Sequence, residues 1–475
     1  MLEIKTKTIA TLGPASNTPS IISDLIEYGM DVARINMSHF KNKDEFEHII
    51  TIIRNESNKQ DKHIGILVDL AGPKIRLDLK QIGKTIDIKK DDIYNLGFEN
   101  SNDIKINTNI NFKNIDLDDA YVKIDDGKIV FKVLEKEENH LIIKALNDGL
   151  ISDRKGVNFP GVELEVDSLT HIDREHLILA AKNDIDWLAL SFVRDSVDIN
   201  PILEIYKKQN IYIPIIAKIE KPEAIENLDS IIDSFDGILI ARGDLGVEMS
   251  LAKLPGLQKM IIEKCRKAKK PVIVATQMLD SMIENSTPTR AEVNDVANAV
   301  YEGADAVMLS GETAIGKYPI ETLQIMQEIL LNTEQEIYHE DISNKISVEI
   351  DRDNRSAIGE SVKLISKHLS INAIVVMTES GSTAIIVSHY RPRNNIFALT
   401  PYRSICNKLS LVWGVIPLMT EEFESTDEMI IESEKLLIKR GLLKLGDTFV
   451  LTAGVPVGVS GTTNMLKIHK ITTTD

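Results

Sequence analysis

The chain has 475 residues, of which 43% are hydrophobic and 27% are charged, and this is the composition of a folded protein with several domains. Its formal net charge of −17 argues against nucleic acid as a main partner, although a local cluster of cations can still bind a small anion. The N-terminal stretch has no signal-peptide core, and no apolar run approaches the ~20 residues of a membrane span, so we expect a cytoplasmic protein without a membrane partner.

Short β-branched runs alternate with amphipathic stretches through most of the first 340 residues. Helices are expected at Ser20–Tyr28, Asp173–Asn183 and Leu257–Ala268. Strands are expected at Lys7–Leu12, Val32–Met37, Ile64–Leu70, Trp187–Phe192, Ile213–Ile219, Gly237–Ala241, Pro271–Thr276 and Ala306–Leu309. Repeated strand–helix alternation predicts parallel strands with right-handed crossovers, and eight such units predict an α/β fold built on a (β/α)8 TIM barrel. A doubly wound open sheet is the alternative.

The insert between the third and fourth expected strands has a different character. Alternating stretches occur at Thr85–Lys89 and Tyr121–Leu134, and turn signals occur at Asp125–Gly127 and Asn147–Gly149. This pattern is typical of β-hairpins. We therefore expect residues 73–170 to form a small β-rich, barrel-like lid domain inserted in a loop of the barrel.

A second α/β region is expected after a polar linker at His339–Asp353. A helix is expected at Arg355–Leu369, and strands are expected at Ala373–Thr378, Asn395–Thr400, Val415–Thr420 and Thr448–Thr452. The predicted domains are a barrel of residues 1–72 and 171–339, the lid of residues 73–170, and a C-terminal α/β domain of residues 340–475.

Polar or ionisable residues follow seven of the eight expected strands, at the end where a barrel places its active site. They are Arg34 to His39, Asp69, Ser191 with Arg194, Lys218 to Glu220, Arg242 to Asp244, Thr276 with Gln277, and Ser310 to Glu312. One charged residue at a strand end is usually a solvated loop residue, but seven such ends on one face favour a single site.

The residue types at these ends indicate the chemistry. Glu220 and Asp244 follow neighbouring strands and can share one hard divalent cation, for which Mg²⁺ is suited. Lys218 lies two residues before Glu220 on the same strand face, where its ammonium can stabilise a transferring phosphoryl group or an enolate. Arg34 offers a planar donor fork for phosphate, and Gly243 permits backbone N–H groups to approach a carboxylate. These residues predict phosphoryl transfer or enolate chemistry on a small anion.

Motifs that would indicate a different nucleotide, metal or disulfide site are incomplete or absent in this sequence. Gly311–Tyr318 reads GETAIGKY, but Tyr318 replaces the Ser or Thr that completes a Walker A loop. No G-x-G-x-x-G follows a strand, and no H-E-x-x-H occurs. Cys265 and Cys406 lie far apart and fit neither a disulfide framework nor a metal site.

The motif series of the chain resembles that of the pyruvate kinases. From Thr8 to Pro319 it reads TIATLGPAS, ARINMSH, GPKIR, KGVNFPGV, LALSFVR, AKIEKPEAI, DGILIARGDLGVE, VIVATQMLDSM, PTRAEVNDVANAV and GADAVMLSGETAIGKYP. The C-terminal LTAGVPVGVSGTTN is similar to bacterial members. The resemblance covers essentially the whole chain. It implies a homotetrameric, Mg²⁺-dependent glycolytic enzyme that transfers the phosphoryl group of phosphoenolpyruvate to ADP, with a lid that closes over the barrel and a C-terminal effector domain.

The resemblance also implies roles for single residues. Lys218 matches the lysine that stabilises the transition state, and Glu220 and Asp244 match the Mg²⁺ ligands. Phosphoenolpyruvate contacts are implied for Arg34, Gly243, Asp244 and Thr276, with Thr276 near the carbon that is protonated. Nucleotide-site positions are implied for Asn36 to His39, Arg76 and Lys155. A K⁺ site is implied for Asn36, Ser38, Asp69 and the backbone of Leu70.

One loop departs from the K⁺-dependent members, which read D-T-K-G-P-E-I-R. This chain reads D-L-A-G-P-K-I-R from Asp69 to Arg76, so that Leu70 and Lys74 replace the threonine and the glutamate. Members with this lysine and leucine resemble K⁺-independent enzymes, and a tethered ammonium can supply the charge of the ion. We therefore expect K⁺ to be dispensable. The alternative is that Lys74 is a solvated hinge lysine and that the K⁺ ligands still bind the ion.

A candidate effector loop, Thr378 to Thr383, follows an expected C-terminal strand and opens a helix. Its glycine and small hydroxylated residues suit a phosphate site, and an ordinary turn is the alternative. The resembling loop in fructose-1,6-bisphosphate-activated members carries a basic residue where this chain has Glu379. A carboxylate repels a doubly phosphorylated sugar, so we expect weak or no activation by the bisphosphate, and a phosphorylated effector with one phosphate stays open.

Two other classes of function compete with this interpretation. A different barrel enzyme acting on an enol or oxoacid, such as a citramalate-type lyase, would not need the lid insert or KGVNFPG. A catalytically inactive regulatory protein would be favoured by loss of Lys218, Glu220 or Asp244, but all three are present. An assay for pyruvate formed from phosphoenolpyruvate and ADP separates the three classes.

Overall fold

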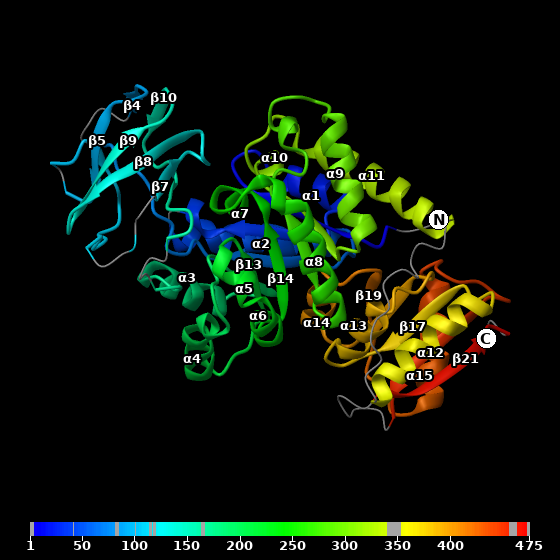
Figure 1. The fold of residues 1–475 in the computed structure, drawn as a ribbon. Helices are drawn as coiled ribbons and strands as arrows, with labels where there is room; N and C mark the ends of the chain where they lie inside the picture. Colours follow the sequence, from blue (N-terminus) through cyan, green and yellow to red (C-terminus); the bar gives the residue numbers. More distant parts are fainter. Residues whose placement is uncertain are drawn as a thin grey trace.

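The computed structural model describes residues 4–40, 42–80, 85–99, 101–113, 116, 120–162, 167–339, 353–455 and 463–472. Figure 1 shows three parts: a central barrel wrapped by helices, a β-rich part on one side of it and an α/β part on the other. These parts follow the order of the predicted domains, while the domain boundaries themselves stay a prediction.

Eight parallel strands close into a barrel in the order β1-β16-β15-β14-β13-β12-β3-β2. They are β1 (Lys7–Leu12), β2 (Val32–Asn36), β3 (Gly65–Asp69), β12 (Trp187–Leu190), β13 (Ile215–Ile219), β14 (Gly237–Ala241), β15 (Val272–Ala275) and β16 (Ala306–Leu309). All eight predicted strands are confirmed, and their bounds differ from the prediction by no more than two residues. The closed barrel also excludes the open-sheet alternative.

Helices cover the outside of the barrel because their apolar faces pack on its buried strands. The longer ones are α1 (Pro19–Glu27), α2 (Lys43–Lys59), α3 (His171–Ala181), α4 (Asn200–Gln209), α8 (Leu254–Lys267), α9 (Arg290–Glu302) and α11 (Pro319–His339). The short α5 (Pro222–Glu226), α6 (Leu228–Ser234), α7 (Arg242–Glu248) and α10 (Gly311–Ala314) follow strands β13, β14 and β16.

The C-terminal part closes the amino end of the barrel. Leu411 packs into the apolar cluster inside the barrel, and Nε1 of Trp187, the first residue of β12, donates to the backbone oxygen of Lys408 at 3.1 Å. The lid lies on the opposite side of the barrel (Figure 1). The carboxyl ends of the strands therefore face the lid and are the end available to ligands.

The lid contains a six-stranded sheet in the order β11-β7-β8-β9-β5-β6 and a two-stranded sheet, β10-β4. Its strands are β4 (Thr85–Ile88), β5 (Ile93–Gly97), β6 (Ile104–Lys105), β7 (Tyr121–Ile124), β8 (Ile129–Lys136), β9 (His140–Ala145), β10 (Gly149–Ser152) and β11 (Val157–Asn158). The predicted turn between β7 and β8 is confirmed, because Asp125, Asp126 and Gly127 all have positive φ. A separate apolar core holds the lid together.

The C-terminal sheet has the order β19-β18-β17-β20-β21. Its elements are α12 (Asn354–His368), β17 (Ala373–Met377), α13 (Ser382–His389), β18 (Ile396–Thr400), α14 (Arg403–Leu409), β19 (Val415–Met419), α15 (Thr426–Lys439), β20 (Thr448–Gly454) and β21 (Thr463–Lys470). The four predicted strands are confirmed, and the antiparallel edge strand β21 was not predicted. Residues 340–352 of the expected linker and residues 456–462 of the C-terminal motif lie outside the described residues.

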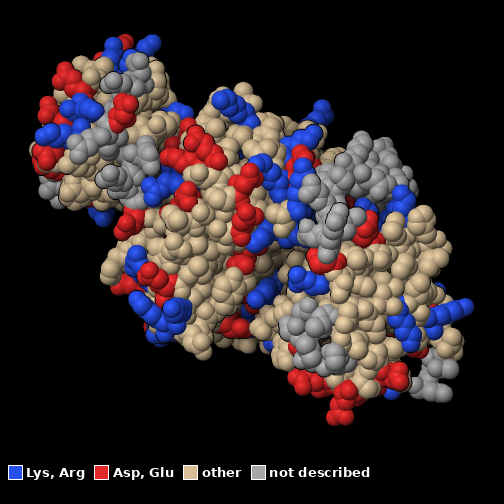
Figure 2. Space-filling view, turned by 60° about the horizontal axis from the view of Figure 1, so that its bottom comes forward, with Lys and Arg blue, Asp and Glu red and all other residues tan. Residues whose placement is uncertain are grey.

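The face shown in Figure 2 intersperses Lys and Arg with Asp and Glu over the lid, the barrel and the C-terminal part. It carries no broad field of one sign. None of the helices in the described part of the chain combines the length and apolar character of a membrane span.

Candidate active site

Asp69, at the carboxyl end of β3, is buried beneath the lid side of the barrel and binds two cations. Its Oδ2 accepts from Nε and Nη2 of Arg34 at 2.8 and 2.6 Å, and its Oδ1 lies 3.2 Å from Nζ of Lys218. Burial opposes ionisation of Asp69, but Lys218 and Arg34 outweigh it and hold the pKa below its usual value. Nη1 of Arg34 also donates to Oγ1 of Thr11 at 2.9 Å, so the guanidinium is fixed in place.

Lys218 is a buried ammonium with three partners. Besides Asp69, Nζ lies 2.9 Å from Oε1 of Glu220 and 2.7 Å from Oγ of Ser191. Burial lowers the pKa of Lys218, but Asp69 and Glu220 outweigh it, so the net shift is above the ordinary value. The lysine is therefore a fixed positive charge and not a proton donor or acceptor at neutral pH.

Glu220 and Asp244 bring two carboxylates to this cluster from β13 and α7. Oε2 of Glu220 accepts from the backbone N–H of Phe192 at 2.9 Å, and burial raises its pKa. Burial also opposes ionisation of Asp244, but Lys74, at 2.7 Å from Oδ1, holds its pKa below the usual value. The described residues contain no group of three or more His, Cys, Asp or Glu placed to hold a metal. Two carboxylates fit Mg²⁺, which takes its other ligands from water and substrate.

The charges of this cluster balance without a ligand. Three carboxylates, Asp69, Glu220 and Asp244, are paired with three cations, Arg34, Lys218 and Lys74. An anionic substrate entering this cluster adds negative charge and requires further positive charge with it. The donor set therefore suits an anion that binds together with a divalent cation.

Gly243 and Thr276 meet at the start of α7. The backbone N–H of Gly243 donates to Oγ1 of Thr276 at 2.7 Å, and this hydroxyl donates to the backbone oxygen of Ala275 at 2.6 Å. Thr276 has φ of +69°, which is rare for a β-branched residue, and Arg242 holds its backbone oxygen at 2.8 Å. Such strain persists only where its surroundings impose it, as in an active site.

The predicted nucleotide residues are brought together in part. Burial lowers the pKa of His39, and the charges of Arg34 and Arg76 lower it further. Nη1 of Arg76 donates to the backbone oxygen of Arg154 at 3.1 Å, next to Lys155 in the chain. Oδ1 of Asn36 accepts from the backbone N–H of Ser38 at 3.0 Å. Nζ of Lys155 lies 2.8 Å from Asp125, a partner within the lid.

Three of the four predicted K⁺ ligands, Asn36, Asp69 and the backbone of Leu70, already accept from a donor of the protein. Both oxygens of Asp69 face cations, and the backbone oxygen of Leu70 accepts from Oγ of Ser191 at 2.7 Å. Lys74 does not reach Asp69 but pairs with Asp244. Lys74 is thus ion-paired within the cluster, and whether Asn36, Ser38 and Asp69 still bind K⁺ stays a prediction.

Sequence reasoning assigned no role to Ser191, although it ends a predicted strand. Its hydroxyl contacts both Nζ of Lys218 and the backbone oxygen of Leu70, so it joins the catalytic candidate to the predicted K⁺ site. Its position directly after a barrel strand was the available signal.

Known proteins resemble this chain in sequence and in fold. A model of the barrel domain of pyruvate kinases matches residues 3–323, and a model of their α/β domain matches residues 356–469. The chain belongs to the pyruvate kinase family. This confirms the family that the motifs resemble, and it makes the chain a glycolytic phosphotransferase that converts phosphoenolpyruvate and ADP to pyruvate and ATP. Pyruvate kinases generally use Mg²⁺ and K⁺.

Individual relatives extend the match over nearly the whole chain. The chain is 40% identical to a pyruvate kinase from Geobacillus stearothermophilus over an alignment of 474 residues that covers 98% of this chain and 80% of the relative. It is also 40% identical to one from Sporosarcina psychrophila, with the same coverage. A crystal structure of a pyruvate kinase from Cryptosporidium parvum superposes with a TM-score of 0.91 at 32% identity, covering 98% of this chain and 96% of that one.

Proposed function

We propose that phosphoryl transfer takes place at the cluster around Lys218, with the roles that the family motifs imply. The observation that carries this proposal is the buried ammonium of Lys218, held between Asp69 and Glu220 at the carboxyl end of the barrel. A fixed cation at that position stabilises negative charge on the transferring phosphoryl group and on the enolate left behind.

The remaining catalytic residues bind and orient phosphoenolpyruvate. Arg34 holds the phosphate, while the backbone of Gly243 and Asp244 and the hydroxyl of Thr276 hold the carboxylate. The bond from phosphorus to the enol oxygen breaks, and a bond to the terminal phosphate oxygen of ADP forms. The enolate then takes a proton at its terminal carbon, near Thr276, and becomes pyruvate.

Glu220 and Asp244 are the residues that hold Mg²⁺, whose charge, when it is bound, offsets the added charge of the substrate phosphates. Supporting this role, Glu220 lies 2.9 Å from Lys218, and Lys74 balances the charge of Asp244 at 2.7 Å. We propose that Lys74 makes K⁺ dispensable, although Asn36, Ser38, Asp69 and Leu70 correspond to K⁺ ligands of the family.

ADP binds on the barrel side of the lid, at Asn36, His39, Arg76 and Lys155. The chain acts in the cytoplasm as a homotetramer, as the family resemblance implies. The loop from Thr378 to Thr383 is the place for a phosphorylated effector: Gly381 has φ of +87°, its N–H donates to Oγ1 of Thr378 at 2.9 Å, and α13 begins at the next residue.

The direct test measures pyruvate from phosphoenolpyruvate and ADP with and without Mg²⁺, in the wild type and in Glu220→Gln. We expect the variant to need a higher Mg²⁺ concentration and to turn over about 10²-fold more slowly. A Glu220→Gln enzyme with wild-type Mg²⁺ dependence would overturn the metal assignment. Lyase activity on an oxoacid without ADP would instead support the competing class.

A further inference from the structure

The C-terminal end of α7 is a place where two side chains of the lid contact the barrel. Nζ of Lys123, in β7, donates to the backbone oxygen of Val247 at 2.7 Å. Nδ2 of Asn158, in β11, donates to Oε1 of Glu248 at 2.8 Å. Lys123 and Asn158 lie opposite one another in the β7–β11 pair, so one rung of the lid sheet supplies both donors.

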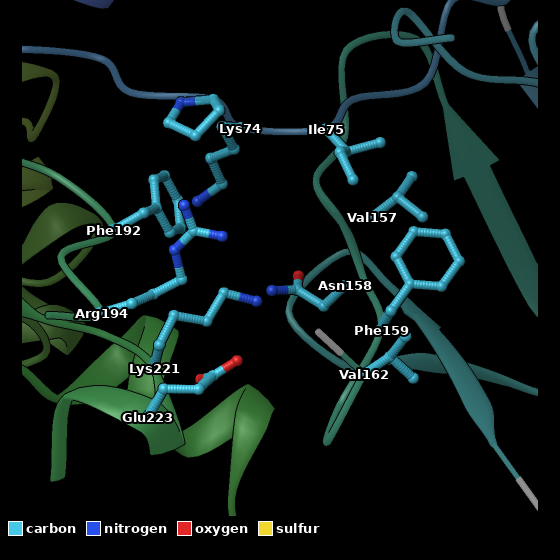
Figure 3. Close-up of a pocket in the computed structure, with 11 residues that line it drawn as sticks. Lys74, Ile75, Val157, Asn158, Phe159, Val162, Phe192, Arg194, Lys221 and Glu223 are labelled. Atoms are coloured by element: carbon cyan, nitrogen blue, oxygen red, sulfur yellow. The ribbon is translucent and has the colours of Figure 1, made fainter. Parts of the chain in front are cut away.

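Glu248 is a buried carboxylate shared between the lid and the barrel. Its side chain is 2% exposed, and the same Oε1 that accepts from Asn158 lies 2.8 Å from Nζ of Lys221. In Figure 3 the side chains of Lys221, from the barrel, and Asn158, from the lid, extend toward one another across the pocket at the hinge. A buried carboxylate that loses one of its donors is strongly destabilised, so the three groups hold one another in position.

This shared carboxylate is directly connected to the metal candidates. Asp244 lies in the first turn of the same seven-residue helix that ends at Glu248. Lys221 immediately follows Glu220 in the chain. Glu248 is therefore linked to Asp244 through one helix of about two turns, and to Glu220 through the Lys221 side chain and the peptide bond that joins Lys221 to Glu220.

We propose that Glu248 is a positioning residue that holds the lid on the barrel and joins the position of the lid to the placement of Glu220 and Asp244. It reaches the reaction only through Asn158, Lys221 and α7. When the lid moves away from the barrel, Glu248 loses the hydrogen bond from the Asn158 amide, and the backbone oxygen of Val247 loses the hydrogen bond from Lys123. The lid, which carries Arg76 and Lys155, thereby assembles the nucleotide side and the metal side of the site together. The proposal rests on the metal roles given above to Glu220 and Asp244.

The test uses Asn158→Ala, which leaves the barrel intact, and Glu248→Gln, which keeps the shape but removes the charge. In the full-length enzyme without substrate, we expect amide hydrogen exchange at β11 and the hinge residues 73–77 to become about tenfold faster in each variant. We expect kcat to fall about tenfold and the Mg²⁺ concentration for half-activity to rise about fivefold, because displacement of an active-site group by ~1 Å costs up to ~10² in rate. The KM for phosphoenolpyruvate should change less than about twofold.

Asn147→Ala is the matched control, because Nδ2 of this lid asparagine donates only to backbone oxygens within the lid, at Lys128 and Asp148, in the bonds that the structure describes. It should leave the hinge exchange and the Mg²⁺ dependence at wild-type values.

The effects of Asn158→Ala and Glu248→Gln should be less than additive in the double variant, since both act on the contact between Asn158 and Glu248. Wild-type exchange in Asn158→Ala, or equal effects of Asn158→Ala and Asn147→Ala, would overturn the proposal. Faster hinge exchange with unchanged Mg²⁺ dependence would instead refute the link to the metal residues. Should Glu248→Gln not fold, Asn158→Ala decides alone.

Discussion

Nζ of Lys74 lies 2.7 Å from Oδ1 of Asp244. Lys74 belongs to the hinge that enters the lid, whereas Asp244 lies in the first turn of α7 in the barrel, so the ion pair spans two parts of the protein. It adds a third cation to the carboxylate cluster that holds Arg34 and Lys218. A fixed ammonium in this cluster is the feature that the K⁺-dependent motif lacks.

The first prediction follows from this ammonium. Wild-type enzyme should show near-full turnover with Mg²⁺ in a buffer free of K⁺, Na⁺ and NH₄⁺, with tetramethylammonium maintaining ionic strength. Lys74→Glu should make turnover depend on K⁺, because the substitution removes one positive charge from the cluster and adds a negative one. Initial rates across a K⁺ titration measure both effects.

Lys74→Met is the matched variant for charge alone, since it removes the ammonium without adding a carboxylate. We expect it to need K⁺ less strongly than Lys74→Glu. A rise of more than about tenfold in wild-type turnover on adding K⁺ would show that the lysine is not the substitute cation.

The second prediction concerns Lys218. Lys218→Met should lower kcat by ~10²–10³, because one preorganised charge at the reacting group is worth about this much. The fold should remain, and circular dichroism with thermal melting checks it.

Lys270→Met is the matched control for Lys218→Met. Nζ of Lys270 donates to the backbone oxygen of Phe235 at 2.7 Å, at the amino end of β15, away from the candidate site. The control should keep wild-type kcat. A Lys218→Met enzyme with more than about half of wild-type turnover would rule out the electrostatic role.

The sequence alone predicted the barrel well because its strands are buried on both faces. Such strands form continuous apolar runs, and parallel connections leave a helix between them, so each strand could be located within two residues. The strand ends then predicted which polar residues would meet, and Asp69, Lys218 and Glu220 do meet. The antiparallel edge strand β21 was missed because it is largely exposed and carries little apolar alternation.

Contacts between different parts of the protein could not be predicted in the same way. The pairing of Lys74 with Asp244 depends on how the hinge approaches α7, and a sequence pattern does not specify that distance. The role of Glu248 also depends on contacts that a sequence pattern does not specify. This residue lies in one of the family motifs, but only the structure places Asn158 and Lys221 beside its carboxylate. Roles that depend on substrate, metal or K⁺ remain predictions.

The third prediction concerns regulation at the loop that contains Glu379. Fructose 1,6-bisphosphate should activate weakly or not at all, because a carboxylate at this loop repels a second phosphate. Glu379→Lys should increase activation by the bisphosphate, since it replaces repulsion with attraction. Steady-state rates at subsaturating phosphoenolpyruvate measure the response. A monophosphorylated sugar is tested under the same conditions as the alternative effector. Strong wild-type activation at micromolar bisphosphate would contradict this prediction.

The fourth prediction concerns stability in mild acid. Burial lowers the pKa of His389 to about 3, and the neighbouring charge of Arg391 contributes. An unfolded histidine titrates near ~6.5, so between these values the unfolded chain binds more protons than the folded chain does. The neutral His389 ring therefore makes its full contribution to the free energy of unfolding above about pH 6.5, and this contribution is lost as the pH falls toward about 3. Between pH 7 and pH 5, protonation linked to His389 should lower the free energy of unfolding by about 2 kcal/mol.

His389→Gln separates this contribution from the rest of the protein. Its free energy of unfolding should be lower than wild type at pH 7, but it should fall less steeply between pH 7 and pH 5. Urea denaturation at the two pH values measures the difference. His63, whose pKa burial lowers to about 4, should leave a remaining slope in the variant. His368→Gln, at the exposed end of α12, is the control and should keep the wild-type pH dependence. Equal slopes in the wild type and His389→Gln would show that the buried ring does not link folding to protonation.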